Sequence, residues 1–259
     1  MKKSLNIKNS LPPVTIILAL LLLWELICKI TAIPEFILPS PSAIGSSLAA
    51  NYRLIASHSV TTLAAVAAGL FLAVTVAVLA ALAMDRWLLI KQAMFPLLVV
   101  SQAVPIFALA PLMLIWFGVG LAPKILIVAL VCFFPLAVSL VEGLEQVNPE
   151  EIELMQVMQA GRWMIMQHVK FPAALPYFFS GLKIAATYSV LGAIIGEWLG
   201  ARAGLGIYML RAKNSFQTSD VFASIIIVVV LSLLLFKIVE ITGSLVMPWR
   251  KEKDLTVED

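Results

Sequence analysis

Long apolar blocks alternate with short polar segments along most of the chain. A helix needs about 20 mainly apolar residues to cross the hydrocarbon core of a bilayer. By this measure the pattern predicts an all-α polytopic membrane protein with six transmembrane helices, in one transmembrane domain that covers residues 1–259. The predicted spans are residues 11–30, 60–84, 94–117, 125–141, 177–199 and 221–247.

The composition does not fit several other classes of protein. Hydrophobic residues make up 61% of the chain and charged residues 13%, whereas soluble domains have roughly 45–50% apolar and about 25% charged residues. A water-soluble monomer, a disordered chain and a nucleic-acid-binding protein all conflict with these values. The two cysteines, Cys28 and Cys132, both lie in apolar blocks and cannot form a disulfide framework.

The distribution of lysine and arginine predicts the orientation of the chain, because cytoplasmic segments carry an excess of both. If both termini are cytoplasmic, the inside segments hold ten basic residues: Lys2, Lys3, Lys8, Arg86, Lys91, Arg162, Lys170, Arg250, Lys251 and Lys253. The outside segments then hold six: Lys29, Arg53, Lys124, Arg202, Arg211 and Lys213. This bias predicts that both termini lie in the cytoplasm.

The longest predicted inside segment, residues 142–176, contains the start signals of a short helix. Asn148 is suited to cap the helix, Pro149 suits its first position, and Glu151 completes a capping-box spacing. The positive end of the helix dipole favours the acidic side chains of its first turns, which are Glu150, Glu151 and Glu153. We expect this helix to end at Gly161, because glycine often follows the last turn.

The short helix also has an apolar side, formed by Ile152, Leu154, Met155, Val157 and Met158. It is too short to cross a membrane. One reading is a surface helix that lies on its own bundle or in the headgroup layer. The other is an adaptable, methionine-rich face that docks in a groove of a cytoplasmic partner. The pattern by itself leaves both readings open.

This segment resembles the cytoplasmic signature of the integral-membrane subunits of ATP-binding-cassette (ABC) importers. That signature reads Glu-Ala-Ala, three residues, Gly, nine residues, then Ile-x-Leu-Pro. Glu153 takes its acidic position, Gln159 stands in place of its glycine, and Val169-Lys170-Phe171-Pro172 takes its terminal position. Residues 171–177 and 38–43 are similar to the same family, so the resemblance runs from the first predicted span to the last.

The resemblance implies that the short helix is a coupling helix, which sits in a cleft of a separate cytoplasmic ATPase subunit. ATP and Mg²⁺ would be bound by that partner, and this chain would bind no cofactor and catalyse no reaction. The chain lacks the Gly-x-x-x-x-Gly-Lys-Ser/Thr stretch that cradles nucleotide phosphates. The residues expected to couple to the ATPase are Pro149, Glu150, Glu151, Glu153, Met155, Met158, Gln159, Ala160, Gly161, Arg162 and Pro172.

The family also implies a homodimer in the lipid bilayer of the bacterial inner (plasma) membrane, and a periplasmic or lipid-anchored substrate-binding protein. It places the fifth predicted span beside the translocation path. Glu197 ends that span without a local partner, and is either an interfacial carboxylate exposed to water or a gate or substrate contact. The candidate path residues are Gln102, Pro105, Tyr188, Ser189, Gly192, Gly196 and Glu197.

The resemblance also bears on which solute would be transported. Residues 180–188 and 196–201 look most like permeases for hydroxymethylpyrimidine or thiamine precursors, within a branch that also handles sulfonates, taurine and nitrate. A path for an anion would be expected to carry a cluster of basic residues. The third and fifth predicted spans hold only one, Lys183, which disfavours an anionic solute. An alternative of another class is an ion-coupled secondary transporter. His58 and His168 lie on opposite sides of the membrane in this topology, so we expect no metal site.

Overall fold

The computed structural model describes residues 7–249, with side chains from residue 15 onward. Lys2, Lys3, Arg250, Lys251 and Lys253, which entered the orientation argument, lie outside the described residues, as does the side chain of Lys8. The described part contains helices and no β-strand. The elements are α1 (Ile7–Ile30), α2 (Pro41–Arg86), α3 (Leu88–Ser101), α4 (Ile106–Phe117), α5 (Leu121–Glu145), α6 (Pro149–Val157), α7 (Arg162–Ile165), the π-helical turn η1 (Met166–Lys170), α8 (Phe171–Trp198), α9 (Leu205–Asn214) and α10 (Thr218–Val246).

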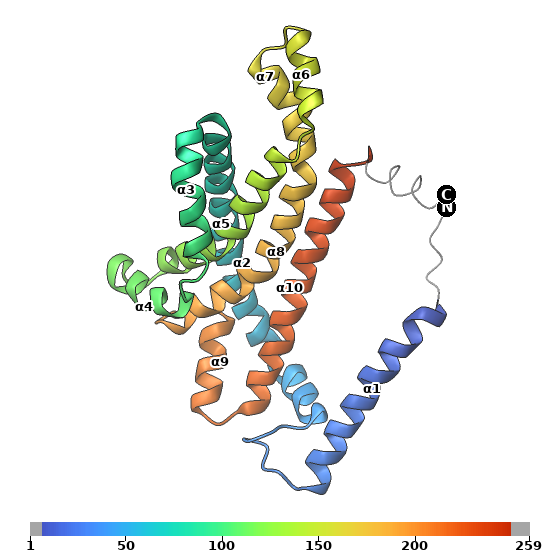
Figure 1. Cartoon of the computed structure of the whole chain (residues 1–259). Coiled ribbons are helices and arrows are strands. Elements are labelled where there is room, and N and C mark those ends of the chain that lie inside the picture. Colours follow the sequence, from blue (N-terminus) through green and yellow to red (C-terminus); the bar gives the residue numbers. More distant parts are fainter. Residues whose placement is uncertain (1–6, 250–259) are drawn as a thin grey trace.

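The long helices α2, α5, α8 and α10 form one bundle (Figure 1). The short helices α6 and α7 project beyond one end of this bundle, and α9 lies at the opposite end. α1 diverges from the bundle and touches it mainly near its own C-terminal end. The all-α fold class predicted from the apolar blocks is confirmed.

Within the described residues, four helices are long and apolar enough to cross a membrane: α2, α5, α10, and α8 together with the turns that precede it. The bent pair of α3 and α4 would make a fifth crossing if it counts as one span. α1 covers the first predicted span. The count of six crossings therefore stays a prediction for α1 and for the bent pair.

The third predicted span, residues 94–117, is not one straight helix. α3 ends at Ser101 and α4 begins at Ile106, and their axes are bent by 105°. Pro105 precedes α4 directly and has no N–H to donate to a continuous helix. Tight turns fill the gap: the amides of Ala103 and Val104 donate to carbonyls three residues earlier, at 3.0 and 3.2 Å.

The second predicted span, residues 60–84, is only part of a much longer helix. α2 runs for 46 residues from Pro41, which at 1.5 Å per residue is roughly 70 Å. Ser40 caps it, with its hydroxyl accepting from the amide of Ala43 at 3.3 Å. Residues 41–59 are too polar to be read as a span, yet the cap and the packing of Ile44 and Ile55 keep them helical.

The most extensive packing in the bundle is between α5 and α8, and small residues on α8 permit it. A Cβ atom added to Gly181 would lie 3.0 Å from the carbonyl oxygen of Pro135, and one added to Gly196 would lie 3.1 Å from the Cα of Lys124. Side chains larger than hydrogen at these points would push the helices apart. Gly181 and Gly196 therefore pack against α5 inside this chain.

We predict that Gly196→Leu destabilises the protein by about 1–3 kcal/mol, because a well-packed helix interface must open to admit the side chain. The thermal midpoint of the purified protein in detergent should fall, and uptake should be lost with it. Gly45→Leu is the matched control, since nothing lies within 4 Å of a Cβ atom at that helical position. An unchanged midpoint in the Gly196 variant would contradict the packing described here.

Candidate functional site

The segment between α5 and α8 begins as its sequence predicts. The side chain of Asn148 accepts a hydrogen bond from the amide of Glu150 at 3.1 Å, and Pro149 is the first residue of α6. The acidic residues Glu150 and Glu151 lie in the first turn, where the helix dipole favours them. The start of the short helix is thus fixed by local interactions alone.

The end of α6 differs from the prediction. The helix stops at Val157, four residues before Gly161, and Gln159 adopts a left-handed conformation with φ of 56°. The amides of Gln159 and Ala160 donate to the carbonyls of Gln156 and Met155, both at 2.9 Å, which is the pattern of a Schellman C-cap. Glycine is favoured at this position because the left-handed conformation costs other residues about 1–2 kcal/mol.

α6 buries none of its residues and projects away from the bundle (Figure 1). A helix that lies on its own bundle is therefore excluded as a reading. Val157 is 81% exposed and Trp163, on the following helix α7, is 73% exposed. We call the exposed apolar side chains here the coupling face: Leu154, Val157, Met158, Trp163 and Met164. Five such side chains in a short projecting segment form a surface suited to a partner.

The remaining residues assigned to coupling lie in the same segment. Ala160, Gly161 and Arg162 connect α6 to α7, and Pro172 lies in the first turn of α8. The segment is held at its two ends by ion pairs. Lys91 of α3 pairs with Glu145 at the end of α5, and Lys170 of η1 pairs with Asp85 at 2.5 Å.

At the opposite end of the bundle, side chains from two other helices cap the N-terminus of α9. The amide of Gly204 donates to Nδ1 of His58 and the amide of Leu205 to Oγ1 of Thr62, both at 2.9 Å. The amide of Gly206 donates to Oε2 of Glu197 at 2.7 Å. Thr62 in turn donates to Oε1 of Glu197 at 2.9 Å. We call His58, Thr62 and Glu197 the α9 cap.

Glu197 is fully buried, so its reading as a water-exposed interfacial carboxylate is wrong. Three features offset the cost of burying this charge. Thr62 and the amide of Gly206 donate to its oxygens, and the buried Lys124 supplies positive charge nearby. The ammonium of Lys124 also donates to the carbonyl of Ala203 at 3.0 Å, which holds the connection between α8 and α9.

Gly204 has φ of 130°, and a Cβ atom there would collide with the carboxylate of Glu197. Glycine is therefore required at this position for two reasons.

His58 stacks on Tyr208 of α9 with 5.4 Å between ring centroids. Burial, followed by the neighbouring Asp220, raises the pKa of Tyr208 to about 12, so its phenol stays neutral and adds no charge to the cap.

The structure brings together only some of the candidate path residues. Ser189, Gly192, Gly196 and Glu197 lie on buried faces of α8, where the hydroxyl of Ser189 donates to the carbonyl of Ala186 in its own helix. Tyr188 is half exposed on another face of α8. Gln102 and Pro105 lie at the break between α3 and α4, and the start of α4 packs against the C-terminal end of α8. Their role in translocation stays a prediction.

Sequence reasoning missed two members of the α9 cap and the buried lysine. The sequence marks His58 only as a possible metal ligand and Lys124 only as a basic residue of an outside segment, and it predicts no role for Thr62. A signal was present, since His58 and Thr62 are polar and are spaced i, i+4 on one face of a helix. What the sequence could not supply was the distance in space to residues 197–206.

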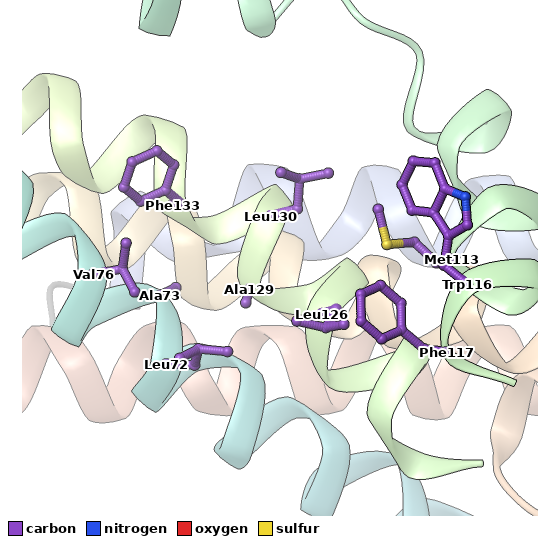
Figure 2. A pocket seen from close by; sticks show the side chains of 10 residues that line it. All are labelled: Leu72, Ala73, Val76, Met113, Trp116, Phe117, Leu126, Ala129, Leu130 and Phe133. Carbon is purple, nitrogen blue, oxygen red and sulfur yellow. The ribbon is translucent and has the colours of Figure 1, made fainter. Parts of the chain in front are cut away.

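An open groove of 350 Å³ lies between α2, α4 and α5 (Figure 2). Leu72 and Phe133 line one part of it, and Met113, Trp116 and Phe117 of α4 line another. The indole nitrogen of Trp116 is the one side-chain hydrogen-bonding group in this lining. Because a polar solute needs several such groups for orientation, this groove does not have the chemistry of a solute site.

Residues 73–250 match the family described as binding-protein-dependent transport system inner membrane component. The match covers more than half of the chain. The chain belongs to this family. It is thus the permease subunit of an ABC importer, and a multi-pass inner-membrane protein, as the apolar helices also indicate.

Curated relatives support the same assignment over nearly the full chain. A probable ABC transporter permease protein of Haemophilus influenzae is 35% identical over 87% of this chain and 92% of its own length. The formylaminopyrimidine transport permease protein of Halalkalibacterium halodurans is 34% identical over 95% of this chain and 98% of its own. A riboflavin transport system permease protein of Chloroflexus aurantiacus is also 34% identical, over 92% and 89% of the two chains.

The fold has a counterpart among solved structures. A crystal structure of an amino acid ABC transporter with histidines matches the permease with a TM-score of 0.60 at 18% identity, over 77% of this chain and 95% of that chain. The relatives are named as transport permeases, which fits a subunit that itself performs no catalysis. Membership of this family implies an ATPase and a substrate-binding protein as partners. The comparisons give no support to an ion-coupled secondary transporter.

We predict that Glu197→Leu lowers the stability of the permease by about 1–3 kcal/mol, because the amide of Gly206 would be buried without an acceptor. Glu197→Gln should lower the stability much less, since an amide oxygen can still accept the hydrogen bond from the amide of Gly206. Thermal unfolding of the purified protein measures both.

Glu142→Leu is the control, because it removes an exposed carboxylate from α5. We expect its midpoint to equal that of the unmodified protein. If Glu197→Leu were equally harmless, the α9 cap would not be a structural feature of the permease in solution.

Proposed function

We propose that this permease forms the path for a small solute, of the hydroxymethylpyrimidine or thiamine-precursor class, and that a separate ATPase drives it by docking on the coupling face. The observation that carries the docking proposal is an exposed apolar face on a short helix that is capped at both ends. Its Asn148 cap and Schellman turn make α6 a defined shape without help from the bundle. Such a helix can transmit a displacement rather than absorb it.

The proposed orientation places α6 and α7 in the cytoplasm and α9 on the outer side, with both termini inside. The distribution of charge supports it. Over the whole sequence, the segments assigned to the inside hold ten lysines and arginines and the segments assigned to the outside hold six. Positive residues concentrate on the cytoplasmic side of membrane proteins, so this bias favours the assignment.

We further propose that the permease acts as a homodimer in which exposed side chains of α8 contribute to the path. Ile184, Tyr188 and Leu191 are about half exposed and recur along one side of α8, while a neighbouring side of the helix is packed against α5. A path between two copies would use the free side of this helix. Tyr188 is the member of the predicted path set that fits this arrangement.

The choice of solute rests on the relatives. The formylaminopyrimidine permease matches almost end to end. Permeases for aliphatic sulfonates, taurine and nitrate match at 32%, 27% and 27% identity, and remain the second candidate class.

We predict that Glu153→Lys uncouples ATP hydrolysis from transport while the protein still reaches the membrane. The reversed charge would stand in an exposed position on α6, in the proposed contact with the ATPase. Solute uptake and ATP hydrolysis would be measured together in vesicles that contain the permease, its ATPase and its binding protein. Glu142→Lys, an exposed reversal on α5, should leave the ratio unchanged. Normal coupling in the Glu153 variant would argue against the docking proposal.

We predict that labelled hydroxymethylpyrimidine accumulates in an ATP-dependent manner in cells that carry the complete importer. Unlabelled thiamine precursors should compete with it, because they would share the binding protein and the path. Taurine and nitrate in large excess should not compete. Competition by taurine or nitrate, without competition by the pyrimidine, would assign the permease to the second class.

A further inference from the structure

α2 and α8 span the distance between the two ends of the bundle, and a polar pair joins them at each end. Near α9, the hydroxyl of Thr62 on α2 donates to Oε1 of Glu197 on α8 at 2.9 Å. At the α6–α7 end, Lys170 pairs with Asp85 in the last turn of α2. Thr62 and Asp85 are separated by about 35 Å of continuous helix at 1.5 Å per residue.

The Asp85–Lys170 pair is more than a surface contact. The two side chains are 14% and 23% exposed and are joined at 2.5 Å. Ion pairs shielded from water in this way are weakened less by solvent and salt than fully exposed ones. The pair links α2 to η1, two elements that are far apart in the sequence.

η1 is the point at which the projecting segment passes into α8. Its five residues form a π-helical turn, and the amide of Phe171 donates to the carbonyl of Met166 across it. Single π-helical turns are often found at functional sites. Lys170 is the last residue of this turn, so Asp85 holds α2 to the junction itself.

α6 buries none of its residues, so a force on it reaches the bundle through the ends of the segment. One end leads to α5 at Glu145, and the other leads through η1 to α8 and, across the ion pair, to α2. Displacement of α8 without α2 would pull Glu197 away from Thr62 and open the α9 cap, because the cap draws residues from both helices.

We propose that the Asp85–Lys170 pair makes α2 and α8 move as one unit when the ATPase displaces α6 and α7, so that the intact α9 cap moves with them. Asp85 and Lys170 are thus positioning residues for transport. This inference rests on the proposed docking of the ATPase at the coupling face. It adds a link between that face and the connection from α8 to α9, which lies 27 residues from Lys170 at Glu197 and 23 residues from Asp85 at Thr62.

The first test breaks the pair. Asp85→Asn and Lys170→Gln should each lower the solute taken up per ATP hydrolysed by about fivefold or more, the lower end of typical coupling between distant sites. The charge swap Asp85→Lys with Lys170→Asp should restore much of the loss, and Lys170→Arg should couple normally. Wild-type coupling in both single variants would overturn the proposal, as would uncoupling in a folded Lys170→Arg variant.

Lys237→Gln is the matched control. It removes a lysine that pairs with Glu240 within α10, so it breaks an ion pair without severing a link between helices. We expect normal coupling in this variant. Equal uncoupling would show that loss of any lysine pair disturbs transport, and would overturn a specific role for Asp85 and Lys170.

The second test measures the accessibility of the α9 end directly, by thiol labelling. Ala203 lies between α8 and α9 and lines an open cavity of 490 Å³, so a cysteine there is within reach of a membrane-impermeant thiol reagent. Cys28→Ala and Cys132→Ala remove the two native thiols. In the assembled importer, the labelling rate of Ala203→Cys should change between the nucleotide-free and ATP-trapped states, and Asp85→Asn should reduce that change. Equal labelling in the two states would overturn the proposal.

The two proposals fail in different ways. If Glu153→Lys does not uncouple transport, the docking of the ATPase on α6 is wrong. If Glu153→Lys uncouples while the Asp85 and Lys170 variants behave like the unmodified permease, the docking stands and the link through α2 is wrong.

Discussion

The arrangement of helices at the α9 end of the permease depends on the hydrogen bonds that the buried carboxylate of Glu197 accepts. A buried charge is costly, and here it is matched by a hydroxyl from α2, an amide from α9 and a nearby ammonium from α5. Each partner comes from a different element, so the carboxylate fixes four helices relative to one another. The first amides of α9 have no capping side chain of their own, and they depend on α2 and α8 instead.

The other end of the molecule is built on the opposite principle. α6 has its own N-cap and its own Schellman turn, and it buries none of its residues. A helix with satisfied ends holds its shape while its apolar side chains remain free for a partner. The family supplies such a partner, an ATPase, and the chain itself has no phosphate-binding loop.

Between the two ends, small residues on α8 decide which surface the bundle leaves available. Gly181 and Gly196 allow α5 to pack closely against one side of α8, while the side chains of Ile184 and Tyr188 are exposed on another side. The groove near Trp116 is also open but almost wholly apolar. The polar interactions of the α9 cap thus have no counterpart in this groove.

The sequence by itself determined the class of the protein, five of the predicted apolar blocks as helices, and the start of α6. These follow from properties that neighbouring residues decide, namely runs of apolar side chains and a cap at Asn148. Tertiary structure decided the bend before Pro105, the 46-residue length of α2 and the burial of Glu197. Pro96 and Pro111 lie inside helices, whereas Pro105 stands at a break, so proline alone did not locate the bend. Glu197 found its partners 135 residues away at Thr62, a proximity that no local pattern encodes.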